Sequence, residues 1–129
     1  MGNNRIRKVT ASTGIITTIA GTGVSGFSGD DGPGTAAQIN NPYGLGADVA
    51  GNCYFTDRGN HRVRRIDAVT GIITTVAGTG VSGYSGDGGL AINAKIYYAQ
   101  DLAFDSSNNL YIADTANSAI RKVDHSTGI

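Results

Sequence analysis

One stretch of this chain occurs twice with almost the same letters. Residues 13–30 read TGIITTIAGTGVSGFSGD and residues 70–87 read TGIITTVAGTGVSGYSGD, so the copies lie 57 residues apart and differ at two positions. Self-similarity at a fixed period indicates that one supersecondary unit is used repeatedly. The repeat therefore constrains the fold more strongly than any single residue does.

The same shift of 57 residues aligns the rest of the sequence, as when Arg64 corresponds to Arg121. Two periods occupy residues 1–57 and 58–114, and residues 115–129 repeat the beginning of the chain. We predict a single repeat domain that starts and stops in the middle of a repeat.

Each period contains four short runs rich in β-branched and aromatic residues, and turn residues close each run. In the central copy these runs are residues 43–48, 53–57, 62–66 and 72–77. Connections this short force successive strands to be antiparallel neighbours. The pattern predicts a four-stranded meander, and the consecutive apolar pair Ile72-Ile73 indicates that both of its faces are covered.

Long connectors, residues 21–42 and 78–99, separate one meander from the next. The first contains TAAQIN, which predicts a single helical turn with Ala37 and Ile39 pointing inward. Ordered connectors of this length are usually functional or packed by their own side chains. We expect packing here, through Phe27 or its counterpart Tyr84.

Several segments of the central copy, PYGLGAD, GNCYFTDRGNHRVRRID and GIITTVAG, resemble the NHL-repeat family, as do DLAFD and NNLYIADTANSAIRKVD further on. The Asn60-His61-Arg62 string is part of the segment that carries the resemblance, and the resemblance covers essentially the whole chain. It implies an all-β fold, the β-propeller, in which four-stranded blades pack face to face around a channel. Repeated meanders that are apolar on both faces predict the same architecture independently.

The chain holds two blades' worth of strands plus one redundant third strand, either residues 5–9 or residues 119–123. A blade covered on one side only leaves a large apolar face in water, which marks an interaction surface. Head-to-tail contacts between complementary ends close into a ring. We predict a homotrimer that forms a six-bladed ring, with an interface made by Arg5, Ile6, Val9, Ile15, Leu102, Tyr111, Ile112, Ile120 and Val123.

No catalytic residue and no cofactor is expected. The acidic turn residues Asp30, Asp31 and Asp87 are weak candidates for calcium ligands, because carboxylate oxygens suit that ion. The second copy lacks a counterpart of Asp31, so we expect Asp30 and Asp87 to accept backbone N–H bonds in their turns. The two histidines, His61 and His125, occupy non-equivalent positions and are too few for a zinc site.

Ten basic and ten acidic residues cancel, which argues against nucleic acid or a membrane surface as a partner. Arg62 and Arg64 share one face of a strand, and we expect them to pair with Asp57 and Asp114 between blades. The sequence contains no signal peptide and no apolar run of transmembrane length, and it assigns no compartment. Cys53 is expected to be a small buried hydrophobe.

These observations predict a non-catalytic propeller fragment that assembles with itself, in a parent protein that is a scaffold for an unknown protein or small-molecule ligand. Two alternatives remain open. One is a propeller that binds small ligands or carbohydrate, with lyase activity in some relatives, and the other is an RNA-binding NHL domain.

Overall fold

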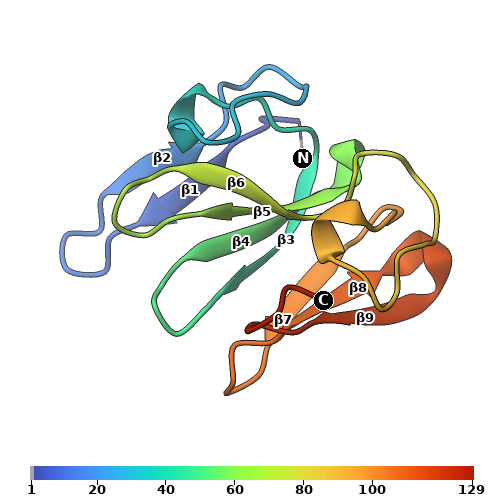
Figure 1. Cartoon of the computed structure of the whole chain (residues 1–129). Helices are drawn as coiled ribbons and strands as arrows, with labels where there is room; N and C mark the ends of the chain where they lie inside the picture. Colours follow the sequence, from blue (N-terminus) through green and yellow to red (C-terminus); the bar gives the residue numbers. More distant parts are fainter. Residues whose placement is uncertain (1) are drawn as a thin grey trace.

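The computed structural model describes residues 2–129 and shows an all-β chain (Figure 1). Within that range each helix is a single 3₁₀ turn, and none is long and apolar enough to cross a membrane. The strands are β1 (Ile6–Val9), β2 (Ile16–Ala20), β3 (Pro42–Ala47), β4 (Cys53–Asp57), β5 (Arg62–Ile66), β6 (Ile73–Ala77), β7 (Asp101–Phe104), β8 (Leu110–Asp114) and β9 (Ala119–Val123). The 3₁₀ turns are η1 (Gly34–Ala36), η2 (Arg58–Asn60), η3 (Ala91–Asn93) and η4 (Thr115–Asn117).

The strands form three antiparallel sheets in chain order: an N-terminal sheet β1-β2, a central sheet β3-β4-β5-β6 and a C-terminal sheet β7-β8-β9. The central sheet is the predicted meander, and its strand boundaries agree with the predicted runs to within one residue. Each sheet pairs only strands that are neighbours in sequence, because the connecting turns are short.

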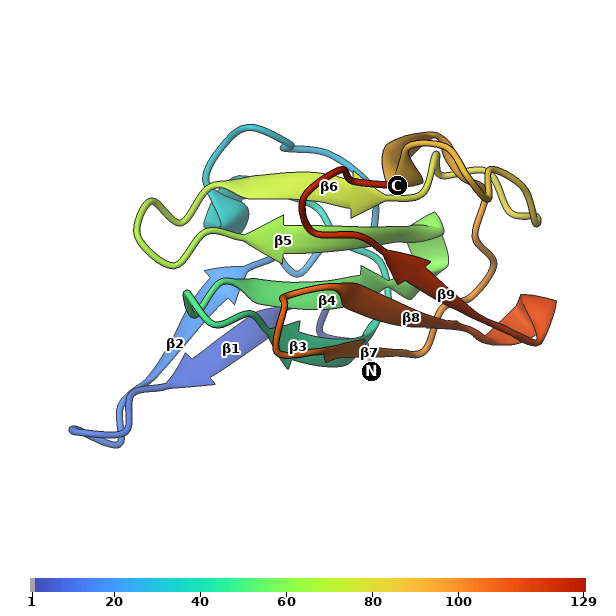
Figure 2. The same ribbon diagram turned by 60° about the horizontal axis from the view of Figure 1, so that its bottom comes forward.

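The three sheets lie face to face, with the central sheet between its two partners (Figure 2). Their closest approach is between β3 and β7, where Gly44 lies against the backbone of Gln100 and Asp101. A Cβ at residue 44 would lie 2.6 Å from the Asp101 Cα, so glycine permits this approach by having no side chain. The blades can therefore fan out from a narrow inner edge.

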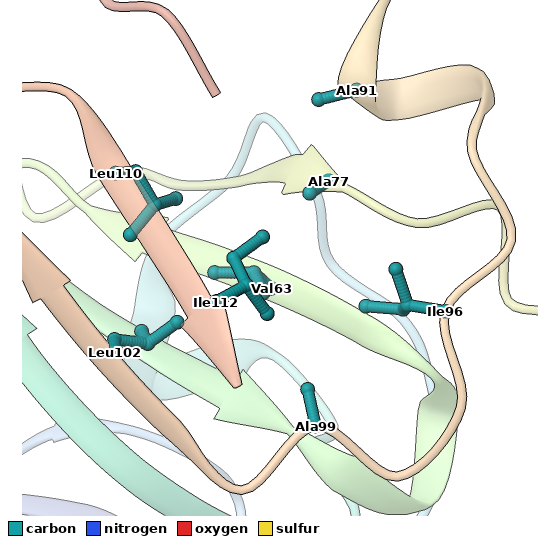
Figure 3. Close-up of a cluster of buried hydrophobic side chains, with 8 residues drawn as sticks. All are labelled: Val63, Ala77, Ala91, Ile96, Ala99, Leu102, Leu110 and Ile112. Carbon is teal, nitrogen blue, oxygen red and sulfur yellow. The ribbon is translucent and has the colours of Figure 1, made fainter. Parts of the chain in front are cut away.

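One apolar core fills the space between the central and C-terminal sheets (Figure 3). Val63 of β5 and Ile112 of β8 are almost completely buried there, at 0% and 2% exposure. The remaining members come from the same sheets and from the second connector: Ala77, Ala91, Ile96, Ala99, Leu102 and Leu110.

A second core covers the opposite face of the central sheet. Phe55, Ile66 and Ile73 of that sheet pack with Ile6 and Ala20 of the N-terminal sheet. The central sheet is therefore buried on both faces, which confirms the interpretation of its consecutive apolar residues.

The connectors pack through small and aliphatic residues, and the expectation that their aromatic residues do so is wrong. Ala37 and Ile39 follow η1 and are fully buried, as the predicted helical turn requires. Phe27 and Tyr84, in contrast, are 40% and 57% exposed. The Phe27 ring instead lies over two guanidinium groups, that of Arg62 at 3.7 Å and that of the buried Arg64 at 4.9 Å, so it covers charges and not an apolar core.

We expect the substitution Gly44→Ala to destabilise the fold by at least about 2 kcal/mol, because its Cβ would force β3 and β7 apart. Urea unfolding followed by circular dichroism measures the change. Gly89→Ala is the matched control, since its Cβ would meet nothing closer than 3.5 Å. Equal midpoints for the two variants would contradict the proposed close approach.

Candidate functional site at the open blade surfaces

A buried arginine ties the first connector to the central sheet. The Arg64 side chain is completely buried, and its guanidinium donates to Asp30 Oδ1 at 2.8 Å and to Asp57 Oδ2 at 3.3 Å. It also donates to the carbonyl oxygens of Gln38, at 2.8 Å, and Ser28, at 2.9 Å. We call these five residues the arginine network. The network satisfies a buried charge with two carboxylates and two carbonyls, as burial of an ion requires.

The second repeat builds the same network at its own positions. Arg121 donates to Asp87 at 2.7 Å, to Asp114 at 3.4 Å and to the carbonyl oxygens of Ser85 and Lys95. The side chain of Arg121 is 10% exposed and that of Asp87 is 62% exposed, because no further strand covers β9. The two networks differ in burial and not in chemistry.

Asp57 and Asp114 do pair with arginines, but the prediction that they pair between blades is wrong. Each carboxylate bonds an arginine on the next strand of its own sheet, since β4 neighbours β5 and β8 neighbours β9. Arg62 forms no such pair. It donates to the Thr79 carbonyl at 2.8 Å and lies 3.7 Å from the centre of the Phe27 ring.

The acidic residues Asp30, Asp31 and Asp87 were the candidates for metal ligands, and Asp30 and Asp87 accept hydrogen bonds from other donors than expected. Besides its arginine, Asp30 accepts from the Thr75 hydroxyl at 2.6 Å, and Asp87 accepts from the Tyr84 hydroxyl at 2.7 Å. Their acceptor roles therefore involve side-chain donors and not the turn backbone. Asp31 has a left-handed backbone with φ of 67°. In residues 2–129, no three His, Cys, Asp or Glu side chains gather closely enough to hold a metal ion.

The outer edge of β9 is open. Ile120, in the middle of this edge, is 73% exposed, whereas its counterpart Val63 is completely buried between two sheets. The repeat places the same kind of side chain at both positions, so the difference arises from the missing neighbour alone. We call residues Ala119–Val123 the open edge.

A cavity of about 540 Å³ lies on the other side of the molecule, between the N-terminal sheet and the central sheet. Ile6, Leu45, Cys53 and Ile66 contribute its apolar wall. Leu45 is 53% exposed, although its counterpart Leu102 is only 8% exposed. We call this cavity the socket, because it lies where a further pair of strands would cover β3. Cys53 is half-buried there, and burial raises the pKa of its thiol.

The nine residues predicted at an interface fall into three groups. Ile6, Leu102 and Ile112 are buried within the cores of the chain itself, so they serve internal contacts. Val9, Ile15 and Ile120 are exposed, at 58%, 61% and 73%. The other three make polar or partly buried contacts within the chain: Arg5 donates to the Thr22 carbonyl, Tyr111 donates to Asp105, and Val123 packs on the first core.

Sequence reasoning missed Leu45. The signal was present, because Leu45 is the repeat counterpart of Leu102, which was predicted at an interface. Its exposure beside the socket makes it the clearest apolar residue without a covering neighbour on β3.

Four-stranded and incomplete antiparallel sheets, stacked face to face about a narrow inner edge, define this chain as part of a β-propeller. The solved structures that it resembles are β-propeller proteins. No family model matches the sequence.

Two of these structures come from Bacteroides thetaiotaomicron. A protein of unknown function superposes with a TM-score of 0.78 at 25% identity, over 94% of this chain and 30% of that one. An auxiliary nutrient binding protein gives 0.70 at 26% identity, over 94% and 32%. Virginiamycin B lyase from Staphylococcus aureus gives 0.58 at 22% identity, over 97% and 32%, which shows the shared fold alone.

A curated relative, the chloroplast protein SUPPRESSOR OF QUENCHING 1 of Arabidopsis thaliana, is 34% identical over 102 residues. The match covers 79% of this chain and 10% of that protein. The chain thus spans about a third of the similar solved proteins and a tenth of this relative.

We expect Arg64→Ala to lower the free energy of unfolding by about 3–5 kcal/mol, because it leaves the buried Asp57 carboxylate without its cation. Arg65→Ala is the control. Its partner Asp67 lies 2.9 Å away at the surface, where such pairs contribute about 1 kcal/mol or less. Denaturant unfolding separates the two, and similar losses would contradict a special role for the arginine network.

Proposed function

We propose that this chain is a non-catalytic segment of an NHL-type β-propeller that joins further copies of itself into a closed ring and presents a face to a ligand. The NHL assignment is supported by the sequence segments around Asn60-His61-Arg62. It is also supported by the antiparallel meanders that these segments form in the central and C-terminal sheets. The non-catalytic role is supported by the commitment of Asp30, Asp57, Asp87 and Asp114 to arginine networks.

The observation that carries the assembly is a duplicated strand. β1 and the last four residues of β9 both read IRKV. β2 pairs with β1 in a register that joins Ile6 to Ala20, and β6 pairs with β5 in the equivalent register, Val63 to Ala77. The open edge therefore offers β2 of a second copy the same hydrogen-bonding partner that β2 already uses.

Two identical strands compete for one position in each completed blade, and the arginine networks favour β9. Arg121 is held by Asp87, Asp114 and two carbonyl oxygens of its own chain. The side chain of Arg7, its counterpart on β1, is exposed and has no hydrogen bond or ion pair with residues 2–129. Accordingly, β9 keeps its place and β1 of the incoming copy is displaced.

Closure of the ring buries the surfaces that one copy leaves open. Ile120 corresponds to Val63 and Leu45 corresponds to Leu102, two residues of one core within the chain. The interface between copies then repeats the interface between the central and C-terminal sheets. Each chain contributes two blades, so three copies form a ring of roughly six blades. That number lies within the usual range for β-propellers.

The proposed ligand-binding role is supported by the kind of protein found among the similar solved structures. One of them is described as an auxiliary nutrient binding protein, and most of each connector and η2 of this chain lie outside the strands. A binding propeller needs such loops on a rigid framework.

Light scattering of the purified chain tests the ring. We expect a mass of about three times 13.2 kDa, and we expect Arg121→Ala to shift it toward single chains. Arg7→Ala changes the equivalent residue of an identical strand and leaves the mass unchanged. The proposal would be contradicted by a folded single chain of 13.2 kDa, or by the same change in mass for the two variants.

Cys53 reports on the socket, because it is the chain's one cysteine and lies in the wall of that cavity. In the ring a neighbouring copy covers the socket, and burial already raises the pKa of the thiol, so maleimide labelling is slow. We expect the Arg121→Ala chain to label at least about tenfold faster under native conditions. Equal labelling rates would mean that nothing covers the socket.

A further inference from the structure

Five side chains gather where η2 meets the end of the second connector, away from the open edge and the socket. The Arg58 guanidinium lies 5.5 Å from the centre of the Tyr43 ring and 4.9 Å from that of Tyr98. Tyr98 stacks on Tyr97 with ring centres 4.8 Å apart, and the His61 ring lies 5.0 Å from Tyr98. We call these five residues the tyrosine cluster.

The tyrosine pair is specific to the second connector. Tyr97 and Tyr98 stand where the first repeat has Asn40 and Asn41, in a stretch where the two copies differ at most positions. The rings are also open to solvent: Tyr43, Tyr97 and Tyr98 are 51%, 37% and 39% exposed. The blade itself therefore does not require the stacked pair Tyr97-Tyr98 or the exposed Tyr43 ring beside Arg58, because the first repeat has no such pair.

Tyr98 is held in a costly backbone conformation. Its φ is 48°, in the left-handed region that asparagine tolerates and that bulky side chains rarely adopt. Strain of this kind persists only where surrounding contacts impose it, and it gathers at functional sites. Asn41, the counterpart, has the same conformation with φ of 53°, so the backbone is common to both repeats and only the side chain is new.

Arg58 is a cation without an anion. Its side chain forms no ion pair and no hydrogen bond with residues 2–129, and its Nε is buried without a partner, as is His61 Nδ1. The nearby carboxylates of Asp57 and Asp114 are already bound to other arginines. The two tyrosine rings therefore hold a guanidinium whose outer N–H groups are uncommitted.

We propose that the tyrosine cluster binds a saccharide that carries a carboxylate. A guanidinium fork matches a carboxylate with two parallel hydrogen bonds, which a ring-held arginine offers without further loss of freedom. The exposed tyrosine rings cover the apolar face of a pyranose ring, while its hydroxyl groups stay in water. A cationic ligand is disfavoured, because the Arg58 guanidinium already lies over the Tyr43 and Tyr98 rings, where a cation would bind.

The exposure of the tyrosine rings argues for a sugar and against an aromatic acid. Tyr43, Tyr97 and Tyr98 are 51%, 37% and 39% exposed, and no member of the tyrosine cluster lines the socket. Apolar ligands are bound where most of their surface is buried, whereas a sugar tolerates one hydrated face. The inference rests on the ligand-presenting role proposed above, but not on closure of the ring.

Nuclear magnetic resonance titration of the full chain with glucuronic acid tests the site. We expect saturable shifts at Tyr97, Tyr98 and Arg58, with glucose at least about tenfold weaker and benzoate without effect. Arg58→Thr, the residue that the next repeat carries at Thr115, is expected to lose at least tenfold in affinity. Arg58→Lys keeps the positive charge but loses the two parallel N–H donors of the guanidinium, so we expect its affinity for glucuronic acid to fall several-fold.

Tyr98→Asn separates a binding role from a structural one. It installs the residue of the first repeat, so we expect the melting temperature to rise by roughly 2–5 °C as backbone strain is relieved, while affinity for glucuronic acid falls at least about fivefold. Tyr84→Phe, which also copies the first repeat but lies outside the cluster, leaves the affinity for glucuronic acid unchanged.

Three results would overturn the inference: no saturable shifts, equal binding of glucose, or tighter binding of benzoate. Unchanged affinity in Arg58→Thr would do so as well. Light scattering on the same samples keeps the two proposals apart. A ring that does not bind glucuronic acid overturns the site alone, and a single chain that binds it overturns the ring alone.

Discussion

The rest of this structure depends on a charge buried between segments that are distant in sequence. Arg64 has no exposed side-chain surface, and the groups that satisfy it come from β4 and from both halves of the first connector. Because a buried guanidinium without partners would cost several kcal/mol, the connector is obliged to lie where its carbonyls and Asp30 can reach it. That position delivers Ala37 and Ile39 into the second core, which in turn spaces the N-terminal and central sheets.

The same logic explains why the chain has open surfaces at all. Val63 and Ile120 occupy equivalent positions, yet one is fully buried and the other is 73% exposed. Nothing local distinguishes them, since both lie on a third strand that carries its own arginine network. A propeller blade is stable on both faces only when it is stacked between neighbours, so each repeat makes surfaces that the next must cover.

Periodicity predicted much of the fold, because a strand pattern repeated at 57 residues reports local hydrogen bonding and side-chain alternation. It was less informative about partners. Ile6, Leu102 and Ile112 were predicted at an interface between chains but lie inside this one, and Asp57 was predicted to bridge blades but bonds the adjacent strand. In each case the residue type was right for burial or pairing, and the sequence did not specify which surface would supply the partner.

The sequence by itself determined the order, length and antiparallel pairing of the strands, since these follow from turn residues and short-range alternation. It also places Tyr97 and Tyr98 where the first repeat has Asn40 and Asn41. Only the tertiary structure decided that these tyrosines would enclose Arg58, which lies about 40 residues earlier, and that Leu45 would be bare while Leu102 is covered. The physical reason is that burial and pairing energies belong to contacts between distant segments, and a strand pattern records the side chains without recording what will be packed against them.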